Sequence, residues 1–297
     1  MAWLKSTNME AVQLYASQCF LGEGPYWHVI RNSFFWVDIE NRKLFEYPMD
    51  SGKVNTWKFQ QRITLVLEGK ADHLILALDQ KIARFNLKTK NLEWIALIED
   101  ITGNRLNDGK CDAKGRLWVG SMSKNFDKGA GAFYSLDEDL KIQKHLDQIT
   151  ISNGMAWTHD DKMLYYIDSP TQKVNAYHFD LESGTIQFDR IAIDIPNSLG
   201  TPDGMCIDVE GKLWIAHYGG SGVYRWDPLT GKLMEKVSLP VPHVTSCAFG
   251  GENLDSLLVT TARENLNADQ LSEFPLSGDV FVIQTKTKGF LPNTSCF

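Results

Sequence analysis

Short apolar or alternating segments follow one another along the chain, separated by turns rich in Gly, Asp, Asn and Pro. Segments such as 34–39, 43–47 and 164–169 each have the length of one β-strand. Long segments with the 3.6-residue periodicity of an amphipathic helix are absent. The pattern therefore predicts an all-β fold of short strands joined by tight turns.

The segment that begins at Glu23 recurs 130 residues later without a gap, so that Trp27 falls on Trp157 and Asp38 on Asp168. A second match relates 107–119 to 203–215 and again aligns an Asp, a Gly and a Trp. Such self-similarity is typical of repeat architectures.

The repeats divide the chain into six units of about 40–50 residues, the size of a propeller blade. Five units begin at Glu23, Asn107, Asn153, Asp203 and, more weakly, Ser246. A degenerate copy at 71–86 occupies the double-length interval after the first. We therefore predict one six-bladed β-propeller domain, residues 1–297, with four strands per blade and a central channel. The Lys-, Asn- and Gly-rich segment 121–132 is expected to be a long loop and a candidate lid.

Composition narrows the set of partners. The net charge of −7 and the lack of a Lys/Arg cluster argue against nucleic-acid binding. No apolar run is long enough to cross a membrane, and five scattered cysteines indicate no disulfide framework. We expect a cytoplasmic protein, monomeric or weakly dimeric.

Four repeat starts carry side chains with oxygen donors: Glu23, Asn107, Asn153 and Asp203. The first strand of a propeller blade commonly lines the channel, so equivalent positions are expected on one ring around the axis. Two carboxylates and two carboxamides form a hard site that favours Ca²⁺, Mg²⁺ or Mn²⁺ and is compatible with Zn²⁺. Asn-Gly and Asp-Gly are also ordinary turn signals, but four such positions in register favour a site.

Other catalytic motifs are absent. The chain has no GxSxG elbow and no HExxH, and the segment 103–110 departs from a P-loop in its glycine spacing. His217 could face the channel mouth, although a structural role is the stronger expectation for it.

Several motifs together resemble the senescence-marker/regucalcin, gluconolactonase and luciferin-regenerating family. They are Glu23-Gly-Pro-x-Trp27, Arg105-Leu-Asn-Asp-Gly-Lys110, Ile151-Ser-Asn-Gly154, Pro202-Asp-Gly-Met205, Gly211-Lys-Leu-Trp214 and the segment 245–251. The similarity extends from about residue 14 to residue 290. It implies a six-bladed propeller with one divalent metal and hydrolysis of a sugar lactone, a reaction of carbohydrate metabolism.

The resemblance also implies roles for single residues. Glu23, Asn153 and Asp203 would bind the metal, Ca²⁺ in first place, while Arg105 and Asn107 would contact substrate. Asp108 would support that loop. Some animal members carry a pair of Glu residues where this chain has Ser123-Lys124-Asn125, so their sugar specificity is not transferred.

Lactone hydrolysis needs a polarised carbonyl and a positioned water, and a cation can serve both needs. In this scheme Asp203 is the general base and Arg105 anchors substrate oxygens. Two alternatives remain open: hydrolysis of another electrophile such as a phosphotriester, and a non-catalytic calcium-binding propeller.

Overall fold

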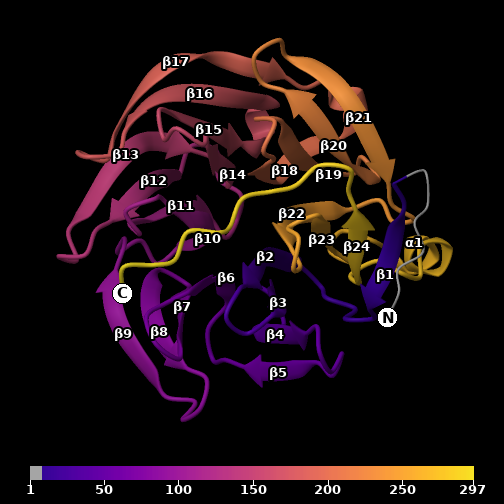
Figure 1. The fold of residues 1–297 in the computed structure, drawn as a ribbon, viewed down its shortest axis with the longest axis horizontal. Coiled ribbons are helices and arrows are strands. Elements are labelled where there is room, and N and C mark those ends of the chain that lie inside the picture. The colour runs from indigo at the N-terminus through magenta and orange to yellow at the C-terminus, as the bar shows by residue number, and fades with distance from the viewer. Residues whose placement is uncertain (1–8) are drawn as a thin grey trace.

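The computed structural model describes residues 9–297 and has six four-stranded antiparallel sheets arranged around a central axis (Figure 1). This arrangement confirms the predicted six-bladed β-propeller. The first three blades contain β2 (Gly22–His28), β3 (Ser33–Asp38), β4 (Lys43–Pro48) and β5 (Asn55–Lys58); β6 (Ile63–Glu68), β7 (His73–Leu78), β8 (Lys81–Asn86) and β9 (Leu92–Leu97); and β10 (Asn104–Cys111), β11 (Leu117–Ser123), β12 (Gly131–Leu136) and β13 (Ile142–Ile149).

The remaining blades contain β14 (Ser152–Trp157), β15 (Met163–Asp168), β16 (Lys173–Asp180) and β17 (Thr185–Asp194); β18 (Thr201–Ile207), β19 (Leu213–Tyr218), β20 (Gly222–Asp227) and β21 (Lys232–Ser238); and β22 (Val244–Gly250), β23 (Ser256–Thr261), β24 (Val280–Gln284) and β1 (Ala11–Tyr15). Two 3₁₀ turns, Ser169–Thr171 and Asn197–Leu199, and one short helix, α1 (Ala268–Glu273), complete the secondary structure. In the described part of the chain no helix is long and apolar enough to span a membrane.

The last blade takes strands from both ends of the described chain. β1 pairs antiparallel with β24, with Ala11 opposite Ile283 and Val12 opposite Val282. This pairing joins the beginning of the chain to its last blade and closes the ring, so that neighbouring blades pack all the way round.

The residues that revealed the repeats have structural roles. Asp112 accepts a hydrogen bond from the indole Nε1 of Trp118 at 2.9 Å, and Asp208 accepts the equivalent bond from Trp214 at 3.0 Å. Both indoles are buried in the core, as expected. The strongest self-similarity therefore marks a repeated buried hydrogen bond that holds the turn between the first two strands of a blade.

The second blade begins earlier than the repeat indicated. The degenerate copy at 71–86 corresponds to β7 and β8, whereas the inner strand β6 starts at Ile63. β6 is buried along its whole length and carries Thr64 in place of an Asn-Gly or Asp-Gly pair. The sequence match missed this strand because its first residues lack the polar marker of the other blades.

A C-terminal strap, residues 285–297, crosses the end of the propeller that faces the viewer in Figure 1. It is held by backbone hydrogen bonds from Val209 to Lys288 and from Lys70 to Phe297. The strap thereby connects blades that are far apart around the ring and partly covers one mouth of the channel.

Candidate active site

The inner strands of all six blades are irregular at equivalent places. Their registers shift within 23–26, 63–65, 106–109, 152–155, 202–205 and 244–246. A bulge of this kind bends a strand and redirects a side chain. In the last blade the displaced residue is Thr245, and Ser246, which we took as a repeat start, pairs regularly with Thr260.

Glycines next to the bulges permit the inner strands to approach closely. A Cβ atom on Gly154 would lie 2.6 Å from the backbone oxygen of Asp203, and one on Gly204 would lie 2.0 Å from Oγ of Ser246. Any larger residue would push the neighbouring blade away. Glycine is therefore required where these inner strands meet at the crowded axis.

A cavity of about 230 Å³ at one end of the channel brings the predicted residues together. Its wall includes Glu23, Arg105, Asn107, Asn153 and Asp203, which come from four different blades. All five side chains are buried in the protein except for the surface that faces this cavity. The convergence expected from the repeats is therefore present.

The amide side chains are oriented by a chain of hydrogen bonds. Arg105 donates to Oδ1 of Asn107, whose Nδ2 donates to the backbone oxygen of Ser152 at 2.7 Å. Asn153 donates through Nδ2 to Oγ of Ser169 at 2.9 Å. The carboxamide oxygen of Asn107 is thus engaged by Arg105, whereas that of Asn153 accepts only a long bond of 3.4 Å from Asn107.

Glu23 and Asp203 are two of the three carboxylates that line the cavity, and the fold disfavours the charged form of both. Burial, followed by the charge of Asp108, raises the pKa of Glu23 to about 8. Burial, followed by the charge of Glu23, raises the pKa of Asp203 well above its ordinary value. Oδ1 of Asp203 is buried and has no hydrogen-bond partner among the described residues.

These residues fit a hard divalent cation. An orphaned carboxylate oxygen, a second buried carboxylate and a fixed amide oxygen are the donors that such ions prefer, and positive charge would relieve the mutual repulsion. Residues 9–297 contain no group of three or more His, Cys, Asp or Glu side chains suited to a metal. A cation here would therefore depend on Asn153 as well as on the two acids.

The loop over the cavity is shorter than we predicted. Residues 121–123 belong to β11 and residues 131–132 to β12, which leaves 124–130 as the connection. Ser123 accepts a backbone hydrogen bond from Asn125 and donates to Asp127 at 2.7 Å, so it holds the turn. Phe126, with 55% of its surface exposed, lines the cavity from this loop.

His217 has a structural position. Its ring stacks on Tyr224 at 3.9 Å between centroids, and Nδ1 lies 2.9 Å from the backbone oxygen of Leu199. Burial lowers the pKa of this histidine to about 4. It does not line the cavity, which agrees with the structural expectation.

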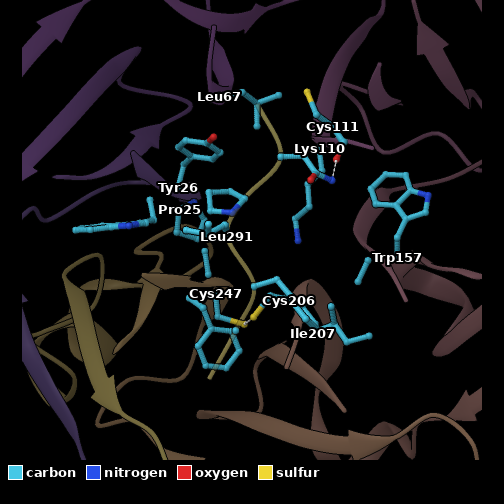
Figure 2. A pocket seen from close by; sticks show the side chains of 18 of the residues that line it. Pro25, Tyr26, Leu67, Lys110, Cys111, Trp157, Cys206, Ile207, Cys247 and Leu291 are labelled. Carbon is cyan, nitrogen blue, oxygen red and sulfur yellow. Dashed lines mark hydrogen bonds between the residues drawn. The ribbon is translucent and has the colours of Figure 1, made fainter. Parts of the chain in front are cut away.

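A larger pocket of about 620 Å³ lies at the strap end of the channel. Figure 2 shows Lys110 extending into it between Tyr26 and Trp157, with Cys206 and Cys247 side by side. The two Sγ atoms are 3.8 Å apart, and all five cysteines of the chain are unbridged. Asp108 lines this pocket and accepts a hydrogen bond from the backbone N–H of Gly109 at 2.7 Å.

Several cavity residues escaped the sequence analysis: Phe126, Ser169, Thr201, Tyr218, Glu264 and Asn265. Ser169 could have been found from the sequence, because the repeat with an offset of 130 residues aligns it with Ile39, which is apolar and buried. A polar residue at an otherwise apolar repeat position indicates a local function. Glu264 lies outside the matched repeats and had no such signal.

Comparisons with known proteins agree with this architecture. The family model described as SMP-30/Gluconolactonase/LRE-like region matches residues 21–263. Human regucalcin is 36% identical over 296 residues, covering 97% of this chain and 98% of its own. The Bacillus subtilis (strain 168) protein named "Putative sugar lactone lactonase YvrE" is 35% identical over 285 residues, covering 96% and 98%.

Among solved structures, a calcium-binding protein, regucalcin, from Agrobacterium tumefaciens superposes with a TM-score of 0.92 at 27% identity. The superposition covers 96% of this chain and 97% of that one. Because the family model matches residues 21–263 and human regucalcin is 36% identical over nearly the whole length of both chains, the chain belongs to the SMP-30/gluconolactonase/LRE-like family.

Proposed function

We propose that this protein hydrolyses a sugar lactone in the 230 Å³ cavity with the help of one divalent cation, Ca²⁺ in first place. Glu23, Asn153 and Asp203 would hold the cation. The observation that carries the proposal is the Oδ1 of Asp203, which has no hydrogen-bond partner within residues 9–297, together with the nearby buried carboxylate of Glu23. The relatives named as a sugar lactone lactonase and as a calcium-binding regucalcin support it.

A bound dication supplies a Lewis acid that polarises a carbonyl oxygen and a positive charge that favours ionised carboxylates. The chain's own residues would perform the proton transfers. Asp203 accepts a proton from the water that attacks the lactone carbonyl carbon, and returns it to the ring oxygen as the carbon–oxygen bond breaks. The hydroxy acid that forms releases one proton to solvent at neutral pH.

Arg105 and Asn107 would position the substrate as a pair. The guanidinium of Arg105 donates to Oδ1 of Asn107 and to the backbone oxygen of Leu106, which fixes its direction. Its remaining donors can bind substrate oxygens without reorganisation. Asn107 therefore acts mainly by orienting Arg105.

The test is proton release from a panel of aldono-lactones, measured after chelation and again after addition of Ca²⁺, Mn²⁺, Mg²⁺ or Zn²⁺. We expect chelation to abolish release and one dication to restore it. If the protein hydrolyses a phosphotriester but no lactone, its substrates are phosphotriesters and the proposed lactone class is wrong. Stoichiometric cation binding with no turnover of either would show a non-catalytic propeller.

The setting of the reaction is part of the proposal. The unbridged cysteines suit a reducing compartment, and we place the enzyme in the cytoplasm, in carbohydrate metabolism, as a monomer or weak dimer. Fractionation and light scattering would test these points.

A further inference from the structure

One wall of the cavity is formed by a mouth loop, residues 262–266, between β23 and α1. Its backbone is held on two sides, because Glu264 donates to the backbone oxygen of Phe20 at 2.8 Å and accepts from the hydroxyl of Tyr218 at 3.1 Å. Asn265 donates to the same hydroxyl at 3.0 Å. Glu264 is thereby held at the cavity wall.

The carboxylate of Glu264 is half-buried and has neither a hydrogen bond nor an ion pair within residues 9–297. A carboxylate withdrawn from water without a partner carries a cost that a ligand can relieve. The charges that act on it most strongly are those of Arg105, which shares the cavity, and Glu40, which lies outside it. Arg105 favours the ionised form of Glu264.

The balance of charge in the cavity depends on this residue. A dication would offset the charges of Glu23 and Asp203, which leaves one guanidinium and one carboxylate, those of Arg105 and Glu264. Without Glu264 the loaded cavity would be cationic and would attract anions. With it the cavity has no net charge, and the carboxylate offers strong acceptors for hydroxyl donors.

We propose that Glu264 is a specificity residue that selects uncharged, polyhydroxylated lactones and disfavours anions, both phosphorylated or uronic lactones and the carboxylate product. The inference rests on the proposed lactone hydrolysis for its substrate class. The product carries one more negative charge than the substrate. A fixed carboxylate at the mouth therefore repels the product but not the neutral lactone, which favours product release.

The test compares Glu264→Gln with the wild type in the cation-loaded protein. We expect kcat/KM for a neutral aldono-lactone to fall about 10-fold through KM, and kcat/KM for the same lactone carrying a 6-phosphate to rise. High salt should reduce the change for the phosphorylated substrate. Glu264→Ser provides a second variant, and a thermal melt of each confirms folding.

Glu40→Gln is the matched control. Glu40 also acts electrostatically on Arg105, but it pairs with Arg62 at 2.8 Å and does not line the cavity. Its substitution removes the same charge and should leave the preference between neutral and anionic lactones unchanged. Equal effects of both substitutions would overturn the assignment, since they would indicate a general field and not a cavity contact.

Binding separates this inference from the proposed function. Calorimetry with an aldonate and with the neutral sugar of the same carbon number needs no turnover. We expect Glu264→Gln to tighten aldonate binding about 10-fold relative to the sugar. If the wild type hydrolyses no lactone but Glu264→Gln still tightens aldonate binding relative to the sugar, the proposed function fails and the charge selection stands. If lactones are hydrolysed and the shift is absent, the charge selection is wrong.

Discussion

Asn153 donates a hydrogen bond of 2.9 Å through Nδ2 to Oγ of Ser169, and Ser169 in turn donates to the backbone oxygen of Pro202 at 2.7 Å. The two bonds connect the fourth blade to the fifth and determine which end of the Asn153 amide faces the cavity. Ser169 therefore positions the only amide oxygen that we assign to the cation.

Ser169→Ala tests this positioning. Loss of the acceptor frees the amide to rotate, and we expect the affinity for Ca²⁺ to fall about 10- to 100-fold, as for other residues that orient ligands. Titration calorimetry on the folded variant measures it. Thr171→Val is the control, because the Thr171 hydroxyl donates to the backbone of Asp168 and does not touch Asn153. Equal affinities in wild type and Ser169→Ala would contradict the role.

Asp203→Asn tests the general base. The substitution retains the shape of the side chain and removes the proton acceptor, so kcat for a lactone substrate should fall by at least ~100-fold. Circular dichroism should show an intact propeller. Turnover close to that of the wild type in this variant would exclude Asp203 as the base.

Without a cation, the free energy of unfolding should decrease as the pH rises from 5 to 8. The pKa of Glu23 is raised from 4.5 to about 8 in the fold, so between these values the native state binds more protons than the unfolded state. The stability that Glu23 contributes is fully present below pH 4.5 and is lost as the pH rises towards 8, by about 1 kcal/mol per pH unit. Thermal melts in chelator from pH 5 to pH 8 measure this slope, after subtraction of the buried histidines, whose effect has the opposite sign.

Added Ca²⁺ should abolish the slope, because a cation stabilises the ionised carboxylates and binds the native state alone. Glu23→Gln should reduce the slope without any cation and leave the part that comes from Asp203, whose pKa is also raised by burial. A chelated wild type whose melting temperature rises steadily from pH 5 to pH 8 would contradict the burial of two uncompensated acids.

His217→Phe separates a structural histidine from a catalytic one. The phenyl ring preserves stacking on Tyr224 but leaves the backbone oxygen of Leu199 without its donor. We expect a loss of about 1–2 kcal/mol in stability with kcat and KM unchanged. A loss of turnover at temperatures where the variant is folded would place His217 in the reaction.

The propeller was predictable because its signals are local and repeated. Each Asp–Trp pair, such as Asp208 and Trp214, stabilises one blade through contacts within a few residues, and the same solution recurs along the chain. The inner strand β6 was missed because its equivalent position carries Thr64, between the apolar Ile63 and Leu65, and has no Asn-Gly or Asp-Gly pair. An inner strand that keeps its buried apolar residues but lacks the Asn-Gly or Asp-Gly pair cannot be aligned with the other repeats from sequence alone.

The sequence by itself determined the blade pattern and the candidate ring, because strand periodicity, turn residues and repeat register are written in neighbouring positions. Only the tertiary structure decided that β1 closes the last blade, that Ser169 orients Asn153, and that Glu264 reaches the cavity with Arg105. These relationships join residues distant in sequence, and they arise from the closure of the ring, which no local pattern encodes.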